Sequence, residues 1–212
     1  DSFPPMGFRN EDNQVVGYDI DLAKEVARRL GVQLAPQPID WNAKEQELNT
    51  GKIDCIWNGF TITAERQKAM LFTKPYLRNA QVVVVKKGSG YATLASLKGK
   101  KVGLQAGSSA ADALEGAKGF KASLEEVVEF KDNLTALMDL EARGVDAVVM
   151  DLIVANDNIK RSGKGYAVLP ESLAPEVFGV GFRKGDQALR DAVQGALEAM
   201  RADGTLARIT TQ

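Results

Sequence analysis

Apolar residues along the chain follow two spacings, one typical of helices and one typical of buried strands. In the segment 19–30, Leu22, Val26 and Leu30 recur every four residues, which predicts a helix with one apolar face. Residues 82–85 are four successive valines, and such a run without alternation is typical of a strand buried on both faces. Helical and strand patterns alternate along the whole chain. The alternation indicates an α/β fold in which helices cover mainly parallel sheets.

The same rules locate the other elements. Asp132 and Thr63 are placed to cap helices, since a short polar side chain just before a helix accepts from its free N–H groups. Segments 48–54 and 140–146 both pass from a helix end through a glycine and an aspartate into an apolar strand. Two similar halves would explain this echo, but any helix–glycine–strand connection looks the same. Further helices are predicted over 44–48, 65–69, 109–114, 133–140, 152–160 and 187–201, and strands over 52–57, 81–86, 101–105, 127–130, 145–150 and 177–183.

Composition removes several classes of chemistry. The chain of 212 residues has no His and one Cys, which excludes Ser-His and Cys-His catalytic pairs, His metal ligands and an internal disulfide. A net charge of −1 offers no broad positive surface for nucleic acid. No apolar run approaches the ~20 residues of a membrane span, and no signal peptide opens the sequence. We therefore expect no metal and no cofactor, and chemistry that rests on carboxylates, cations and hydroxyls.

The segment 53–66 carries the most informative group of polar residues. A strand ends there, Gly59 permits close approach of the backbone, Thr61 offers a hydroxyl, and Arg66 falls near the start of the next helix. Amide N–H groups, a hydroxyl and a two-pronged guanidinium together suit a carboxylate. Taken alone, Arg66 is better explained as a solvated surface arginine.

Ten motifs occur in order over nearly the whole chain: FPPMGF (3–8), VGYDIDL (16–22), GKID (51–54), NGFTITAER (58–66), FTKPY (72–76), LKGKKVG (97–103), QAGS (105–108), RGVDAVVMD (143–151), GVGFRK (179–184) and RADGT (201–205). In this order they resemble one family, the polar amino-acid solute-binding proteins of ABC importers. The resemblance implies a periplasmic binding protein-like fold, with two Rossmann-like lobes joined by two crossing strands that close on a ligand. Lobe one would comprise 1–79 and 178–212, lobe two 82–175, and the hinge strands 78–81 and 176–177.

The resemblance also implies roles for individual residues. Arg66 matches the arginine that grips a ligand α-carboxylate, with Thr61 and the Gly59 backbone at the carboxylate and the ammonium. Ser109 matches a residue whose backbone N–H reaches the carboxylate from lobe two, and a helix N-terminus at Ser108 and Ser109 favours an anion. Ser108 is equally placed as a plain helix cap, and both roles are compatible.

Asp151 matches the carboxylate that pairs with the ligand α-ammonium. It follows an apolar strand, where open α/β sheets bind ligands, although capping of the helix after it is an alternative. Phe3 and Trp41 match aromatic walls, but either is also compatible with core packing. Asn58 and Gln105 match positions that vary with side-chain specificity.

These positions predict the ligand and the partners. Arg66 and Asp151 serve the two ends of an amino acid, and no second acid or cation is evident, so we expect a small or polar neutral amino acid: glycine, alanine, serine or glutamine. Its delivery to the membrane permease of an ABC importer, outside the cytoplasm and by a monomer, follows from the resemblance. A dehydratase-like enzyme on this fold lacks a spare general acid or base. A receptor sensor domain is the other alternative.

One departure from the family stands at the beginning. Relatives have a first strand, ending in an acidic residue, ahead of the motif at Phe3, whereas this sequence starts at Asp1 and Ser2. We expect either a trimmed or engineered sequence, or one from which a segment is omitted.

Overall fold

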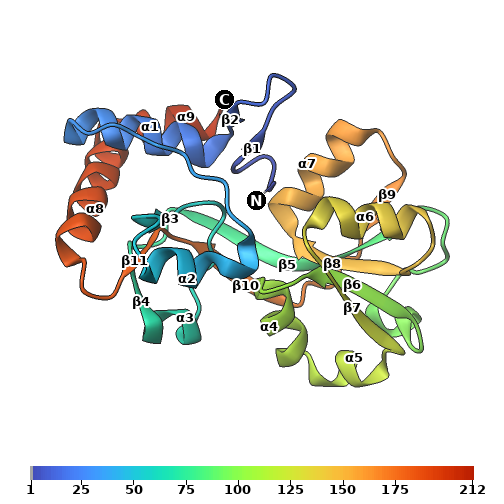
Figure 1. Cartoon of the computed structure of the whole chain (residues 1–212). Coiled ribbons are helices and arrows are strands. Elements are labelled where there is room, and N and C mark those ends of the chain that lie inside the picture. Colours follow the sequence, from blue (N-terminus) through green and yellow to red (C-terminus); the bar gives the residue numbers. More distant parts are fainter. Residues whose placement is uncertain (1) are drawn as a thin grey trace.

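The computed structural model describes residues 2–212, so Asp1, where the expected lobe one begins, lies outside the described residues. Two lobes lie side by side and are connected by strands β5 (Leu77–Lys86) and β10 (Ala174–Phe178) (Figure 1). The two connecting strands pair antiparallel, with Glu176 opposite Asn79. Among residues 2–212, no helix combines the length and the apolar character needed to cross a bilayer.

The second lobe is built on a sheet of six strands. Its order is β10-β5-β8-β6-β7, with β9 also paired to β5; β6 is parallel to β7 and β8, and the other pairs are antiparallel. Besides β5 and β10, its elements are β6 (Lys101–Gln105), β7 (Glu126–Phe130), β8 (Ala147–Asp151), β9 (Tyr166–Val168), a 3-10 turn (Leu94–Leu97), α4 (Ser109–Gly116), α5 (Lys118–Ser123), α6 (Asn133–Glu141) and α7 (Leu152–Ser162).

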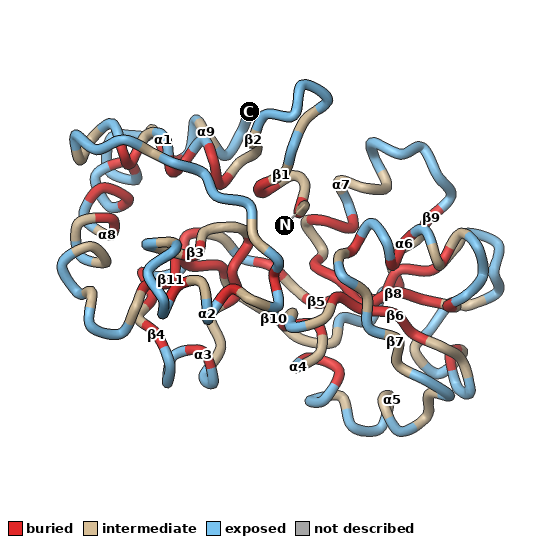
Figure 2. The backbone as a smooth tube through the Cα atoms, in the orientation of Figure 1, coloured by how far each residue is buried: buried red, intermediate tan, exposed pale blue. Residues whose placement is uncertain are grey.

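The valine run of β5 explains why this sheet carries helices on both faces. Val82 and Val84 join the apolar cluster that includes α6 and α7, whereas Val83 and Val85 join the cluster that includes α4. Successive side chains of a strand point to opposite faces, so an all-apolar strand needs a covered sheet on each side. In Figure 2 the buried backbone of this lobe is concentrated in its strands.

The first lobe contains both ends of the chain. Strand β11 from the C-terminal part lies between β3 and β4, antiparallel to each, and β1 and β2 form a separate hairpin. Its elements are β1 (Phe8–Arg9), β2 (Val15–Val16), α1 (Tyr18–Leu30), a 3-10 turn (Trp41–Ala43), α2 (Lys44–Asn49), β3 (Cys55–Ile56), α3 (Ala64–Ala69), β4 (Met70–Phe72), β11 (Gly181–Arg183), α8 (Gln187–Ala202) and α9 (Thr205–Thr210).

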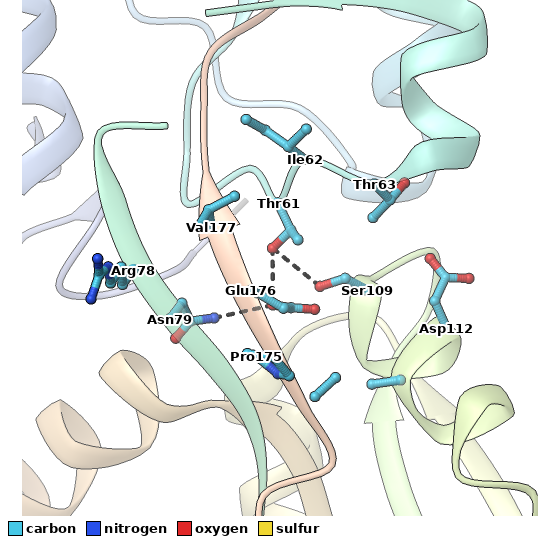
Figure 3. Close-up of a pocket in the computed structure, with 12 residues that line it drawn as sticks. Thr61, Ile62, Thr63, Arg78, Asn79, Ser109, Asp112, Pro175, Glu176 and Val177 are labelled. Carbon is cyan, nitrogen blue, oxygen red and sulfur yellow. Dashed lines mark hydrogen bonds between the residues drawn. The ribbon is translucent and has the colours of Figure 1, made fainter. Parts of the chain in front are cut away.

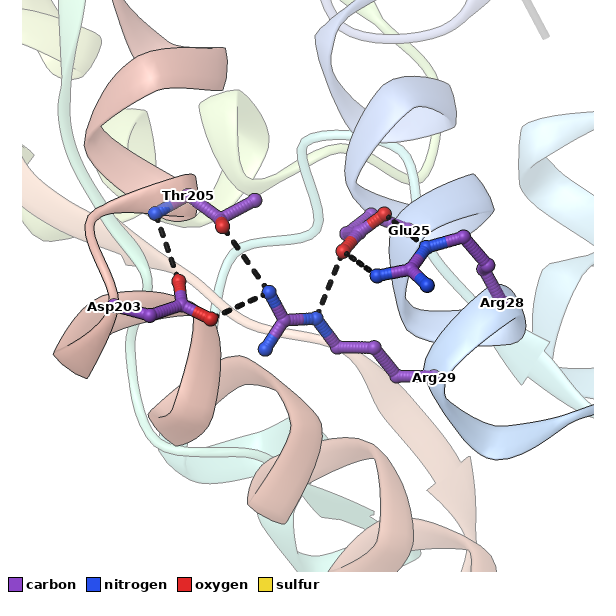
Figure 4. A network of polar contacts seen from close by, with 5 residues as sticks. All are labelled: Glu25, Arg28, Arg29, Asp203 and Thr205. Atoms are coloured by element: carbon purple, nitrogen blue, oxygen red, sulfur yellow. Dashed lines mark hydrogen bonds and ion pairs between the residues drawn. The ribbon is translucent and has the colours of Figure 1, made fainter.

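A polar network joins helix α1 to the turn between α8 and α9 (Figure 4). The Arg29 guanidinium donates to Glu25 at 2.8 Å, to Asp203 at 2.7 Å and to Thr205 at 3.1 Å. The Asp203 side chain is half-exposed, and exposed pairs add little to stability. The network therefore contributes more to the orientation of α8 and α9 than to the stability of the lobe.

The mixed α/β fold with two lobes is confirmed, and the long helices fall where the periodicity predicts them. Several expected strands differ in extent: β5 begins at Leu77 instead of 81, and β8 spans Ala147–Asp151 instead of 145–150. The stretch 177–183 is divided between β10 and β11, with Gly179 in the break, where a Cβ would lie 2.7 Å from Ile62. The strand expected over 52–57 pairs only at Cys55–Ile56. The pattern also missed β1, β2, β4, β9, α5 and α9, each of six residues or fewer.

Candidate functional site

One cavity between the lobes collects all but one of the residues that the sequence singles out. The exception, Thr61, hydrogen-bonds to Ser109 in its wall at 3.3 Å. The enclosed space is about 10 Å³, the size of a single water molecule. The lining consists of Phe3, Trp41, Asn58, Gly59 and Arg66 from the first lobe and Gln105, Ser108, Ser109 and Asp151 from the second.

Arg66 is positioned by the start of helix α3. The Thr63 hydroxyl accepts from the Arg66 N–H at 3.1 Å, which confirms the predicted cap and places Arg66 in the first turn. Its guanidinium donates to the carbonyls of Thr61 at 2.8 Å and of Gly107 at 3.3 Å, and lies over the Phe60 ring. Burial lowers the pKa of Arg66, and within residues 2–212 it forms no ion pair. The surface-arginine alternative is wrong, because the residue is only 8% exposed.

Lys44 is a second buried cation that the sequence reasoning missed. Its ammonium donates to the Gly107 carbonyl at 2.9 Å and to the Trp41 carbonyl at 3.3 Å, and lies 5.0 Å from the centre of the Trp41 ring. Burial first, and the nearby Arg66 second, lower the pKa of Lys44 to about 8. The sequence offered one signal, the three-residue spacing from Trp41, which puts both on one side of a helical turn. We call Arg66 and Lys44 the positive pole.

The start of helix α4 completes this side of the cavity. The Ser108 hydroxyl donates to the Gln105 carbonyl at 2.7 Å and makes no capping hydrogen bond, so the plain-cap alternative is wrong for its side chain. The free N–H groups of the first helical turn carry partial positive charge. An anion at this place would therefore meet the helix start together with the positive pole.

Asp151 ends strand β8 as a buried carboxylate. Asn79 donates to it at 2.6 Å, and it makes no capping hydrogen bond to α7, so the capping alternative is wrong here as well. Burial raises the pKa of Asp151 to about 7; the charge of Glu176 adds to the shift, and hydrogen bonds from Gln81 and Asn79 oppose it. A carboxylate held this way gains from a neighbouring cation.

Glu176 is a second acid at the same place, which the sequence reasoning did not count. One oxygen of its carboxylate accepts from Thr61 at 3.0 Å and from Asn79 at 3.2 Å (Figure 3). The same oxygen accepts from Gln81 at 3.0 Å. Glu176 therefore adds a second acid beside Asp151, although it borders the larger neighbouring pocket and not this cavity. We call Asp151 and Glu176 the negative pole. Its position in a predicted hinge strand was the available signal. The sequence alone does not show that this strand lies close to the end of β8.

Gly59 is fixed by a buried aspartate. The Asp19 carboxylate accepts from the Gly59 N–H at 2.6 Å and from the Tyr76 hydroxyl at 2.7 Å, and burial raises the pKa of Asp19 to about 6. Gly59 has φ +53°, and a Cβ there would lie 2.4 Å from the Phe3 ring. Because the amide is committed to Asp19, the carbonyl is the group that Gly59 can offer a ligand.

Aromatic and amide side chains form the rest of the lining. Phe3 and Trp41 are 6% and 7% exposed, so each is a wall of the cavity and a buried packing residue at once. Asn58 donates to the Gly7 carbonyl at 3.2 Å, and Gln105 donates to the Lys131 carbonyl at 3.3 Å. Both amides are neutral.

A larger pocket of about 600 Å³ lies against the connecting strands (Figure 3). It shares Ser109 with the smaller cavity and is bordered by Asp112, Glu176 and the exposed Arg78. None of its lining residues is a buried cation that could face Asp112 or Glu176. The smaller cavity, where buried charges of both signs meet, is the better candidate for a ligand. Within residues 2–212, no three acidic or cysteine side chains are grouped as metal ligands would be.

Comparison with known proteins finds relatives of one functional kind. The chain is 32% identical over 208 residues to the L-cystine-binding protein TcyJ of Escherichia coli K12, covering 97% of this chain and 76% of that protein. It is 34% identical to the histidine-binding periplasmic protein of Salmonella typhimurium, covering 98% and 82%. These relatives are solute-binding proteins rather than enzymes.

Solved structures show the same fold. An ABC uptake transporter substrate-binding protein from Streptococcus pneumoniae with bound histidine superposes with a TM-score of 0.95 at 37% identity, covering 98% of this chain and 87% of that one. An ancestral arginine-binding protein bound to arginine gives 0.90 at 40% identity, covering 98% and 92%. The family model for bacterial extracellular solute-binding proteins, family 3, matches residues 1–212. The chain is a member of that family.

Proposed function

We propose that the protein binds one free α-amino acid as a zwitterion between its lobes. The observation that carries the proposal is the pair of buried charges in one cavity, Arg66 from the first lobe and Asp151 from the second. Within residues 2–212, neither forms an ion pair. A buried charge without a counterion is costly, and a zwitterion supplies both counterions at once. Its carboxylate would bind Arg66 and the Ser109 amide, and its ammonium would bind Asp151 and the Gly59 carbonyl.

The ligand side chain that this lining suits is small or polar and neutral, such as glycine, alanine, serine or glutamine. Asn58 and Gln105 offer hydrogen bonds without charge, and Phe3 and Trp41 limit the space. The relatives named above bind cystine, histidine or arginine, and an ancestral arginine-binding protein at 38% identity has been solved with glutamine. A ligand of six heavy atoms at up to ~1.5 kcal/mol each would reach about micromolar affinity.

Binding would proceed by closure of the lobes. A cavity of about 10 Å³ has no room for an amino acid, so the lobes must part to admit the ligand and must close around it less tightly than in this arrangement. We place the hinge at 78–81 and 176–177, in the two strands that connect the lobes. Because neither lobe holds both charges, the ligand stabilises the closed form by its differential affinity.

The family places this binding step in ABC import. We propose that the closed, loaded protein delivers its amino acid to the membrane permease of an importer outside the cytoplasm, as a monomer and without catalysis. The periplasmic relatives and the solved substrate-binding proteins support this place in transport.

A thermal-shift screen of the L- and D-amino acids tests the function and identifies the ligand. A compound that binds only the native protein raises its melting temperature. We expect one or a few amino acids with small or polar neutral side chains to give the largest shift. A flat response to every amino acid would overturn the proposed function, whereas a shift with arginine alone would overturn only the neutral side-chain class.

A further inference from the structure

The positive pole contains a second cation, Lys44, which has no role in the ligand contacts proposed so far. Lys44 on α2 and Arg66 on α3 both donate to a single neutral atom, the Gly107 carbonyl oxygen of the other lobe. The two residues are 5% and 8% exposed. Two like charges on one uncharged acceptor is an arrangement that an added anion would relieve.

The acidic groups around Lys44 do not supply that anion. Glu45 on its own helix and Asp112 on α4 act on it only at a distance, and Arg66 opposes its charge. Within residues 2–212, Lys44 makes no ion pair within 4 Å, and its hydrogen bonds go to the carbonyls of Trp41 and Gly107. The ammonium is thus buried beside the cavity with neutral partners.

The contact with the second lobe is closely fitted. A Cβ on Gly107 would lie 2.9 Å from the Asn42 side-chain oxygen and 3.6 Å from the Lys44 nitrogen. The turn around Gly107 therefore meets residues 42 and 44 only when the lobes are together. Of the two hydrogen bonds of Lys44, the one to Trp41 lies within its own lobe and the one to Gly107 spans the two lobes.

We propose that Lys44 is a second cation for the ligand carboxylate, acting as a positioning residue beside Arg66 rather than by displacing it. The inference rests on the proposed function. Arg66 would make the direct contact from the cavity wall, and Lys44, held on the same oxygen, would add attraction for the negative charge. It would sharpen discrimination between a carboxylate and an uncharged carboxamide, a preference that the helix start alone does not provide strongly.

The test compares wild type with Lys44→Met and Lys44→Gln. Both remove the charge, but glutamine keeps an N–H donor for the Gly107 carbonyl, which separates charge from hydrogen bonding. Lys52→Met is the matched control, since Lys52 is an exposed lysine at the far end of the same helix region. The probes are L-alanine, L-glutamine and the carboxamides of both, measured by calorimetry with displacement titrations for weak binders.

We expect both Lys44 variants to weaken amino-acid binding about 10-fold while changing carboxamide binding less than about 2-fold, and Lys52→Met to change neither. A merely structural role would weaken both kinds of probe by the same factor, and that result would overturn the inference, as would unchanged affinities. If Lys44→Gln retains the wild-type preference, the hydrogen bond and not the charge is responsible, and the inference fails. If wild type binds no amino acid at all, the proposed function fails with it.

Discussion

The two poles beside the cavity are built in different ways, and of their four side chains only that of Glu176 is not fully buried. The negative pole lies on one sheet: Asp151 on β8 pairs in register with Gln81 on β5, and Asn79 on β5 pairs with Glu176 on β10. The positive pole spans the gap, because the cations of α2 and α3 are held by a carbonyl of the opposite lobe. If the lobes separate, we expect strand pairing to keep the first arrangement, apart from the hydrogen bond of Thr61 to Glu176, and the second to break.

This difference gives an order of events. The ammonium of an amino acid would find a preformed site on the sheet, and its carboxylate would then draw the cations of the other lobe into place. Closure is a rigid-body motion about a few connecting residues. The ligand therefore has to stabilise the closed state through contacts that the open state lacks. The positive pole supplies those contacts. Breaking each pole separately should therefore have distinct consequences.

Arg66→Ala should have the largest effect. It removes the direct partner of the carboxylate, and we expect amino-acid affinity to fall at least about 100-fold, because a buried charge of the ligand loses its partner. Calorimetry with the ligand found in the thermal-shift screen measures the change. The variant should keep its fold, because Arg66 makes no ion pair that holds the lobe together.

Arg208→Ala is the control for this loss, since Arg208 is an exposed arginine of the last helix. It should bind as wild type does. Equal affinity of Arg66→Ala and wild type would show that the ligand carboxylate does not bind at the positive pole.

Asp151→Asn should have the second largest effect, and it should depend on the ligand. We expect roughly a 30-fold loss for an amino acid, because the ammonium loses its ionic partner while the amide keeps a hydrogen-bonding oxygen. A carboxylic acid that lacks the ammonium, such as propionate beside alanine, should lose little. Parallel titrations of the two compounds against both proteins decide this, and equal losses would place the ammonium elsewhere.

A pH dependence should be the smallest effect and the one that separates the poles most clearly. The pKa of Asp151 is raised from 3.8 to about 7, and a cationic ligand group needs the ionised form. Affinity should therefore increase as pH rises through about 7 and fall up to ~10-fold per pH unit below it, because binding must then release one proton. Calorimetry between about pH 6 and about pH 8 records the profile, in the range where the ligand zwitterion is unchanged.

Two variants sharpen this measurement. Asp151→Asn should remove the rise around pH 7. It should leave a residual slope near pH 6 from Asp19, whose pKa is about 6, and a decline near pH 8 as Lys44, whose pKa is about 8, loses its proton. Glu176→Gln should move the midpoint to lower pH, because the charge of Glu176 contributes to the raised pKa of Asp151. A wild-type profile that is flat across this range would show that Asp151 does not carry the binding charge.

The sequence predicted much of the site because its chemistry is local. Arg66 follows its capping residue Thr63 by three positions, and Asp151 follows an apolar strand directly, so each motif contains the residue and the element that positions it. The long helices and the valine strand were also readable, since their periodicity repeats over many residues. The short elements β1, β2 and α9 were not, because two to six residues do not establish a period.

The residues that were missed depend on contacts far apart in the chain. Glu176 reaches the negative pole only because β10 pairs with β5, which is nearly 100 positions earlier in the sequence. Lys44 joins Arg66 only because the Gly107 turn of the other lobe accepts from both. Ser108 and Asp151 were compatible with helix capping until the geometry showed other partners for their side chains.

The sequence by itself determined that this is an α/β chain of the solute-binding family with one candidate cation and one candidate acid. Hydrophobic spacing and local motifs carry that information, because they act over a few residues. The tertiary structure decided that each pole holds two charges and that one pole spans both lobes. Charges interact through space and not along the chain, so their number and balance at a site exist only once the lobes are folded and brought together.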